Sequence, residues 1–311
     1  MERLTATSHG IARAVELLRA GELVAIPTET VYGLAADAAN ERAVIQIFAA
    51  KGRPRGNPLI AHVATLQQAQ ELVEFSPLAL QLAEQFWPGP LTLVLPRTAH
   101  CAVSLWATTG LDTLAVRIPA HATALAVLRA FGAPLVAPSA NPSGQLSPTS
   151  ADHVDPDLAS AVVDGGQCAI GLESTIVQIS TERAWLLRPG GIPTARLEAI
   201  CGPLADGTSQ KHPRSPGQFA SHYAPRLPLR INATTVQTTE AALTFGAIEL
   251  TGAATALNLS QSGDLNEAAA NLFAFLRRLD DPRWSGIAAM PIPDSGIGQA
   301  INDRLRRAAH R

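Results

Sequence analysis

Apolar residues recur along the chain at helical and strand spacings, and their order predicts a mixed α/β protein. Between residues 8 and 21, Ile11, Val15 and Leu18 share one helical face, with Ser8 as the expected N-cap and Gly21 as the expected end. The next segment, ELVAIP at 22–27, is predicted to be a buried strand because its apolar run is short. A helix followed by a strand is the unit from which α/β folds are built.

The same alternation continues toward residue 200. Helices are predicted after Asn40, after Thr65 and from Ser76, where a capping side chain precedes an apolar face, and also at ATALAVLRAF, 122–131. Strands are predicted at PLIAHV (58–63), LTLVL (91–95), TLAVRIP (113–119), LVAP (135–138), STIVQIS (174–180) and WLLRPG (185–190).

A change in composition after residue 203 predicts a domain boundary. Residues 204–227 are rich in Pro, Gly, Ser and basic side chains, as linkers are. Beyond them, RINA, FGAIEL, TALNLS, DLNEAAANLFAFLRRLDD, IAAMPIP and GIGQAINDRLRRAA predict a smaller βαβ domain. We therefore expect a first domain over 1–203, a linker over 204–227 and a second domain over 228–311.

Charge and cysteine content narrow the class of protein. The 24 basic and 26 acidic side chains give a net charge of -2, so we expect the chain as a whole not to attract nucleic acid or anionic membranes. The three cysteines form no CxxC pair, so neither a disulfide framework nor a zinc site is indicated. No apolar run approaches the roughly 20 residues that span a bilayer, so we expect a cytoplasmic protein without membrane contact.

Polar motifs follow predicted strands, where open α/β sheets usually bind ligands. PTETVYGL at 27–34 offers hydroxyl and carboxylate groups, and PSAN at 138–141 offers Ser139 and Asn141, with Ser147 close behind. Taken singly, a capping turn explains the first motif as well as a ligand site does, and ordinary turn chemistry explains the second better.

Cations gather in a second kind of motif. KGRPRGN at 51–57 places Lys51, Arg53 and Arg55 at alternate positions, so that several cations can face one anion such as a triphosphate. A solvated basic loop is the plainer alternative. Arg117 and Arg188 each end an apolar strand and need an anionic partner, which is either a ligand or a structural salt bridge.

Motifs of several common enzyme classes are missing from the sequence. It contains no GxxxxGK[ST] loop, no GxGxxG after a strand, no GxSxG elbow and no HExxH. A protein nucleophile is not required if the substrate itself attacks a phosphorus that the protein positions and neutralises.

Read together, the motifs resemble a known family in order and spacing. PTETVYGL, KGRPRGNPLIAHV, WPGPLTLVL, AVRIP, APSANPSGQLSPT, ESTIV and LRPG resemble the YrdC-type threonylcarbamoyl-AMP synthases, over a match from Gly10 to Cys201. SPGQFASHYAP in the linker and the closing GIGQAINDRLRRAA are similar to the long, two-domain form. The resemblance implies a YrdC-like catalytic domain, built on a twisted mixed sheet with a cleft, and a smaller Rossmann-like domain after it.

The resemblance also implies a reaction and its partners. L-Threonine, bicarbonate and ATP yield L-threonylcarbamoyladenylate and pyrophosphate, the first step in modifying the adenosine beside the anticodon of certain tRNAs. Mg²⁺ accompanies ATP, and no side chain is expected to be a metal ligand. A tRNA-modifying transferase complex is expected to receive the adenylate, without stable nucleic-acid binding by this chain.

Site residues carry over from the family by motif. The expected threonine contacts are Thr30, His62, Arg117, Ala137 and Ser174. The expected ATP contacts are Lys51, Arg53, Asn57, Thr113, Ser139, Asn141, Ser147, Arg188 and Tyr223, with Lys51 and Arg53 as the catalytic cations. Tyr223, in the HYAP of the linker, is expected to help close the pocket as part of a lid over residues 215–225.

Two other functions stay open at this point. The same domain type occurs in carbamoyltransferases that form a carbamoyl-adenylate, and its concave basic surface could hold RNA instead of ATP. A missing cysteine-rich zinc segment disfavours the first, and the net charge disfavours the second. No motif indicates what the second domain does.

Overall fold

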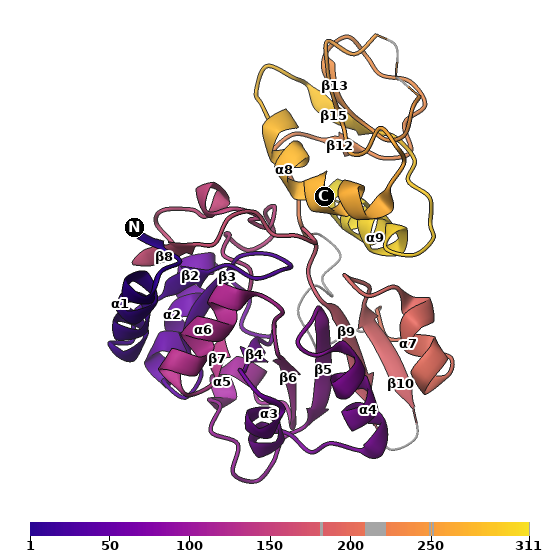
Figure 1. Cartoon of the computed structure of the whole chain (residues 1–311). Coiled ribbons are helices and arrows are strands. Elements are labelled where there is room, and N and C mark those ends of the chain that lie inside the picture. Colours follow the sequence, from indigo (N-terminus) through magenta and orange to yellow (C-terminus); the bar gives the residue numbers. More distant parts are fainter. Residues whose placement is uncertain (181–182, 209–221, 249, 251, 311) are drawn as a thin grey trace.

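The computed structural model describes residues 1–180, 183–208, 222–248, 250 and 252–310, which form two domains (Figure 1). The strands of the first domain are β1 (Glu2–Thr5), β2 (Val24–Ile26), β3 (Gly33–Asp37), β4 (Ile60–His62), β5 (Leu91–Pro96), β6 (Thr113–Arg117), β7 (Leu135–Val136), β8 (Ala161–Asp164), β9 (Thr175–Ile179), β10 (Ala184–Arg188) and β11 (Ala205–Asp206). They form one mixed sheet in the order β1-β8-β2-β3-β7-β4-β6-β5-β9-β10-β11.

Within the described residues of the first domain, five helices begin at a capping side chain, whereas two others have no side-chain cap. The capped helices are α1 (Ser8–Arg19), α2 (Glu41–Lys51), α3 (Leu66–Leu72), α4 (Pro77–Phe86) and α5 (Leu105–Thr108), and the other two are α6 (Ala122–Phe131) and α7 (Thr194–Cys201). Asn40, Thr65 and Ser76 cap α2, α3 and α4 as predicted. For α1 the predicted cap is wrong by one residue, because Thr7 accepts the Gly10 N–H and Ser8 is already helical.

Strand pairing brings the polar motifs to one region of the sheet. β4 pairs in parallel with β6, which places His62 opposite Arg117. An isolated bridge joins Gly33 to Ser139, so the end of PTETVYGL lies against PSAN. β9 begins directly after Ser174 and pairs in parallel with β5. Motifs that are far apart in the sequence therefore meet where these strands start or end.

The second domain has a four-stranded parallel sheet. Its strands β12 (Leu229–Arg230), β13 (Glu240–Thr244), β14 (Thr255–Asn258) and β15 (Gly286–Ala289) have the order β12-β15-β13-β14, and its helices are α8 (Leu265–Leu279) and α9 (Gly298–Ala309). The expected α/β class is confirmed. The strand predicted at FGAIEL is wrong, because the paired strand is the preceding EAALT and the chain then turns at Gly246, whose φ is +77.

The two domains pack closely against each other. A Cβ on Gly171 would lie 2.6 Å from Ala270 Cα of α8, so the loop and the helix touch directly. Leu146 and Leu172 of the first domain share one buried apolar cluster with Tyr223 and the core of the second domain. The first sheet continues past residue 203, since β11 pairs with β10, and residues 209–221 of the predicted linker lie outside the described residues.

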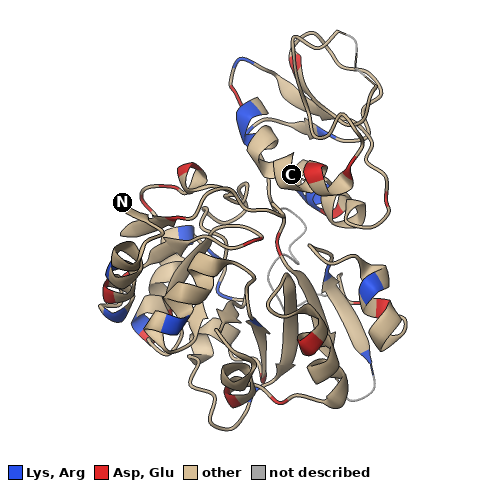
Figure 2. Cartoon of the chain, in the orientation of Figure 1, with Lys and Arg blue, Asp and Glu red and all other residues tan. Residues whose placement is uncertain are grey.

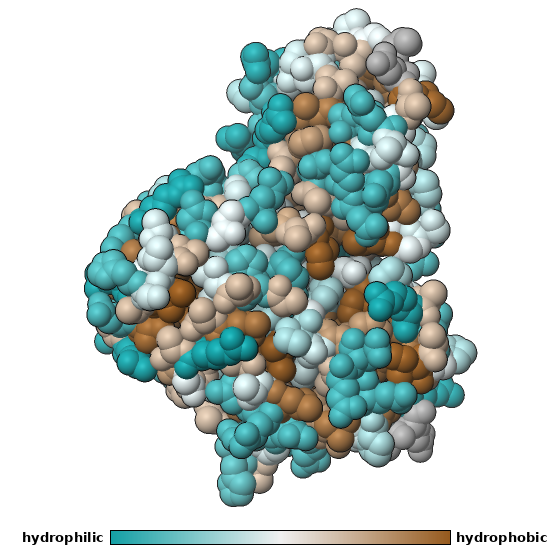
Figure 3. Space-filling view, in the orientation of Figure 1, coloured by the Kyte–Doolittle hydropathy of each residue, from teal (hydrophilic) through white to brown (hydrophobic). Residues whose placement is uncertain are grey.

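In the view shown, the described residues form neither a large patch of one charge sign nor a large apolar patch. Figure 2 shows the positions of acidic and basic residues interspersed along the backbone of both domains, and Figure 3 shows hydrophilic and hydrophobic residues mixed across the same face. Within the described part of the chain, none of the helices is long and apolar enough to cross a bilayer.

A glycine beside the start of β9 gives a test of this packing. A Cβ on Gly190 would lie 2.4 Å from backbone atoms of Glu173, Ser174 and Thr175. We expect Gly190→Ala to lower the free energy of unfolding by about 1–3 kcal/mol, measured by urea denaturation, because the backbone must shift. Gly56→Ala is the control, since a Cβ there meets nothing within 4 Å. Equal stabilities of the two variants would contradict the close approach.

Candidate functional site

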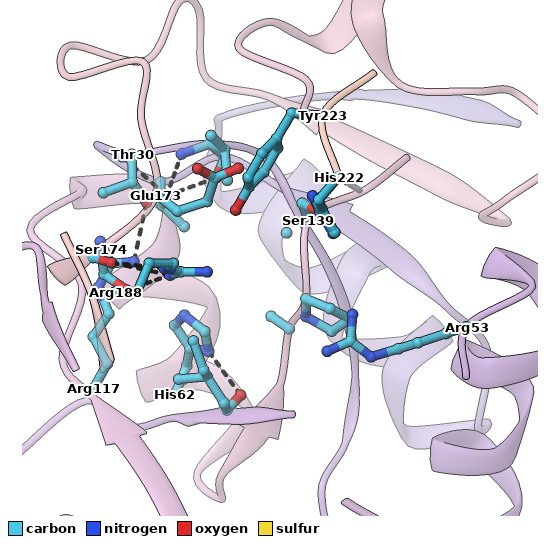
Figure 4. Close-up of a pocket in the computed structure, with 16 residues that line it drawn as sticks. Thr30, Arg53, His62, Arg117, Ser139, Glu173, Ser174, Arg188, His222 and Tyr223 are labelled. Atoms are coloured by element: carbon cyan, nitrogen blue, oxygen red, sulfur yellow. Dashed lines mark hydrogen bonds between the residues drawn. The ribbon is translucent and has the colours of Figure 1, made fainter. Parts of the chain in front are cut away.

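One buried cavity lies where the motifs meet (Figure 4). Predicted site residues line most of its wall: Thr30, Arg53, His62, Arg117, Ala137, Ser139, Ser174, Arg188 and Tyr223. Figure 4 shows Arg53 approaching from the side opposite Arg117 and Arg188, with Tyr223 on a third side near Glu173. Segments spread over the first 223 residues thus converge on a shared space.

Arg117 is held by Glu29, the carboxylate of the PTETVYGL motif. Its Nη2 donates to Glu29 Oε1 at 2.5 Å, its Nη1 to Thr30 Oγ1 at 3.0 Å and its Nε to the Gly89 carbonyl at 3.1 Å. The structural salt bridge that the sequence left open is therefore present. A guanidinium has five N–H donors, so these three bonds leave two for a ligand in the cavity.

His62 is a neutral acceptor in this environment. Burial, aided by the nearby Arg117, lowers the pKa of His62 to about 3. Its Nδ1 lies 3.2 Å from the Ile60 carbonyl, which only accepts, so Nδ1 carries the proton. Nε2 consequently keeps its lone pair and can accept a hydrogen bond.

The three cations of the KGRPRGN motif lie in different surroundings. Arg53 lines the cavity and donates to the carbonyls of Asn57 at 3.0 Å and Pro58 at 2.8 Å. Burial and the charge of Arg188 lower the pKa of Arg53 to about 9, which leaves it protonated at neutral pH. Arg55 is exposed and stacks on Trp106 at 5.5 Å. Of these three cations, Arg53 alone lines the cavity, while Lys51 lies behind the wall and Arg55 lies over Trp106.

Lys51 lies behind the cavity wall and joins two motifs. Its ammonium donates to the carbonyls of Ser139 and Asn141, and its own carbonyl accepts from the Ser143 N–H at 2.7 Å. Burial and the neighbouring Arg53 lower the pKa of Lys51 well below its usual value. Lys51 does not line the cavity, so the structure places it as the link between KGRPRGN and PSAN.

A second buried carboxylate, Glu173, lies in the wall beside Ser174. Its Oε1 accepts from Ser147 Oγ at 2.5 Å, and its Oε2 accepts from Arg304 Nε of α9 at 2.8 Å. Although burial opposes its charge, Arg304 and Arg188 hold the pKa of Glu173 below its usual value. Ser147 is thus placed behind Glu173 and not on the cavity.

The remaining expected ATP contacts lie away from the cavity lining. Both polar atoms of the buried Asn57 amide, and Oδ1 of the buried Asn141 amide, have no hydrogen-bond partner in the described part of the chain. Such orphaned groups are costly unless a ligand or water meets them. Thr113 is four residues along β6 from Arg117, about 13 Å at roughly 3.3 Å per residue, which puts it outside the cavity.

The linker end closes the cavity with His222 and Tyr223. Both line it, and their rings meet edge to face with centroids 4.0 Å apart. The cavity is partly open to solvent and has a volume of about 50 Å³, room for a few waters. A larger ligand must extend beyond this space or displace part of the wall. Of the lid expected over residues 215–225, those up to 221 lie outside the described residues.

Family models match this chain from residue 16 to residue 310, apart from residue 191. Residues 16–190 match a family model named for Sua5, YciO and YrdC and described as "Telomere recombination". Residues 192–310 match a model described as the C-terminal domain of threonylcarbamoyl-AMP synthase. The chain belongs to the two-domain threonylcarbamoyl-AMP synthases. Its activity is the first step of threonylcarbamoyladenosine modification of tRNA, as the resemblance implied.

Individual relatives agree with this assignment. The threonylcarbamoyl-AMP synthase of Bacillus subtilis is 42% identical over 330 residues, which cover 99% of this chain and 95% of that protein. The Pyrococcus abyssi synthase is 41% identical over 318 residues, covering 95% and 93%. The crystal structure of P. abyssi Sua5 complexed with L-threonine has a TM-score of 0.91 and covers 99% of this chain and 97% of that one, at 37% identity.

The neutral histidines of the cavity predict how stability depends on pH. The pKa of His62 is about 3 in the folded chain against 6.5 for an ordinary histidine, so the folded state binds fewer protons between these values. The free energy of unfolding should therefore fall as pH drops from 6.5, by up to about 1.4 kcal/mol per pH unit for this histidine. His222, whose pKa burial also lowers to about 3, adds a similar share.

His62→Gln should reduce the pH dependence of the free energy of unfolding by the contribution of one histidine. The measurement is urea unfolding of wild type and variant between pH 6.5 and pH 5, above the range in which ordinary carboxylates titrate. Identical slopes would show that His62 is not held neutral by the fold.

Proposed function

We propose that the cavity binds ATP and L-threonine together and joins the carbamate of threonine to AMP. The observation that carries the proposal is an excess of buried positive charge. Arg53, Arg117 and Arg188 line the cavity, and Glu173 is the one carboxylate among its described lining residues. Glu173 is already paired with Arg304, and the lining histidines are neutral. Such a site favours an anionic ligand.

L-Threonine is assigned to the end formed by Arg117 and His62. The two remaining N–H groups of Arg117 can hold the substrate carboxylate, with Glu29 fixing the guanidinium from behind. His62 Nε2 accepts from the substrate amine or hydroxyl, and Thr30 and Ser174 offer further hydroxyls. The methyl of Ala137 lines the same wall. The crystal structure of the P. abyssi relative with L-threonine supports threonine as a ligand of this fold.

ATP is assigned to the end formed by Arg53, Ser139, Arg188 and Tyr223. These residues line the cavity from the side of the KGRPRGN and PSAN loops. The amide of Asn57 and Oδ1 of Asn141 belong to the same two loops and lack partners among the described residues, so they would meet the nucleotide if the wall moves on binding. Lys51 acts indirectly, because its ammonium does not face the cavity but holds the two loops together. Thr113 and Ser147 reach ATP only if the wall rearranges on binding.

The proposed chemistry needs no protein nucleophile. The amine of threonine takes up carbon dioxide from bicarbonate, and a carbamate oxygen attacks the α-phosphorus of ATP. The bond from the α-phosphorus to the bridging oxygen breaks, and pyrophosphate leaves with its electron pair. Arg53 and Arg188 offset the negative charge that develops on the phosphate oxygens.

Mg²⁺ fits this site as an ion carried by the triphosphate. Among the described residues, no group of three or more His, Cys, Asp or Glu side chains could hold a metal ion, and both Glu173 oxygens are engaged. A site of this kind suits Mg²⁺ held chiefly by phosphate oxygens and water. When bound with ATP, the ion shares the charge of the phosphates.

The product is a mixed anhydride, which a second protein must consume. We propose that a tRNA-modifying transferase complex in the cytoplasm receives it. The net charge of -2 supports such a handover, since the chain lacks the positive charge with which proteins usually hold tRNA.

Pyrophosphate release tests the proposed reaction. Purified protein with ATP, Mg²⁺ and bicarbonate should release pyrophosphate when L-threonine is added, and much more slowly with other amino acids. Release that does not depend on threonine would favour a carbamoyl-adenylate-forming enzyme. No release, together with RNA binding that weakens steeply with salt, would favour the RNA-binding alternative.

Two arginines of the same loop form a matched pair of variants. Arg53→Ala should cost about 2–4 kcal/mol of transition-state stabilisation, seen as a fall in kcat/KM for ATP, because Arg53 faces the cavity. Arg55→Ala should leave kcat/KM near wild type, since Arg55 is exposed and lies over Trp106. Equal losses in the two variants would remove Arg53 from the proposed role.

A further inference from the structure

A buried arginine of the second domain touches the wall of the cavity. Arg304 lies on α9, the helix along the side of the second domain that faces the first (Figure 1), and its side chain is 0% exposed. Its Nε donates to Glu173 Oε2 at 2.8 Å, and its Nη1 donates to the Pro189 carbonyl at 2.8 Å. Glu173 lines the cavity, and Pro189 directly follows Arg188, which also lines it. One side chain thus joins the second domain to two points of the wall.

The same guanidinium also lies against Tyr223. Arg304 Cζ is 5.1 Å from the centroid of the Tyr223 ring, and that ring stacks on Phe273 of α8 with centroids 5.5 Å apart. Tyr223 has a φ of +63, a conformation that is uncommon for a residue with a side chain and that persists where surrounding contacts impose it. The second domain therefore fixes Tyr223 through both of its helices.

Stability alone is a poor explanation for a charge at this place. Burial opposes the charge, yet Tyr223, Glu173 and Asp303 together raise the pKa of Arg304 above its usual value. Apolar side chains of similar volume often replace a buried ion pair with no loss of stability. In the described part of the chain, Arg304 Nη2 has no hydrogen-bond partner, so the network is not the most stable that this space allows.

We infer that Arg304 is a positioning residue for adenylate formation, and that the second domain acts through it to hold Glu173 and Tyr223 around the nucleotide. The inference rests on the proposed function and gives the second domain a part in it. Glu173 in turn accepts from Ser147, so the loop after PSAN is positioned through the same carboxylate. Arg304 does not line the cavity and touches no substrate.

Steady-state pyrophosphate release tests the inference in Arg304→Met and Arg304→Lys. Arg304→Met should lower kcat/KM for ATP at least about tenfold. The KM for L-threonine should stay within about twofold, because Arg117 and His62 are held by strands of the first domain. Arg304→Lys keeps the charge but lacks the planar fork, so its kcat/KM should lie between those of Arg304→Met and wild type. If Arg304→Met does not fold, the lysine variant decides.

A matched control and a double variant separate positioning from general destabilisation. Arg306→Met changes an exposed arginine of the same helix and should leave kcat/KM unchanged. If Arg304 acts through Glu173, adding Glu173→Gln to Arg304→Met should cause little further loss. The kcat/KM of the double variant should therefore lie within about twofold of that of Arg304→Met alone.

Two results would overturn the inference alone. One is a wild-type kcat/KM for ATP in folded Arg304→Lys and Arg304→Met, even with a lowered Tm. The other is a kcat/KM of the double variant that falls by the product of the losses that the two substitutions cause separately. By contrast, a wild-type protein that makes no threonine-dependent pyrophosphate would reject the proposed function, and the inference with it.

Discussion

Buried positive charge is the constraint on which the rest of this structure depends. Three arginines face one small cavity, and burial lowers the pKa of two of them, Arg53 and Arg188. Each is held by oxygen acceptors: Arg53 by two loop carbonyls, Arg117 by Glu29 and Arg188 by the Ser174 carbonyl. These acceptors keep the guanidiniums in place while leaving the cavity itself electropositive, which is the condition for taking up a polyanion.

Most of these acceptors lie in loops next to strands, because the strands begin or end at the cavity. His62 and Arg117 are neighbours through the pairing of β4 with β6, and Ser174 immediately precedes β9. The loops that carry Arg53 and Ser139 flank β4 and β7, which pair antiparallel, and the buried Lys51 ammonium joins these loops further. The second domain closes the remaining side, with the Arg304 and Glu173 pair at the junction. The side chains that line the cavity are therefore held in place by contacts from parts of the chain that are distant in sequence.

Much of the fold could be predicted from the sequence, because it rests on local rules. Asn40, Thr65 and Ser76 cap helices as their side-chain chemistry dictates, and apolar periodicity located β5, β6 and β9. Local rules failed where two neighbouring segments both satisfy them. EAALT and FGAIEL are both apolar and short, and only pairing with β15 and β14 selects the first as β13.

By itself, the sequence determined the α/β class, the two domains and the family, since motif order and spacing survive without knowledge of contacts. It also supplied most residues that line the cavity. Only the tertiary structure decided which partner each charge meets. Glu29 lies in a motif that a capping turn explained equally well, and Arg304 carries no local signature. Arg55 looks equivalent to Arg53 in the sequence, yet Arg53 lines the cavity and Arg55 lies over Trp106. The physical reason is that the energy of a buried charge depends on groups distant in sequence, whereas caps and periodicity depend on near neighbours.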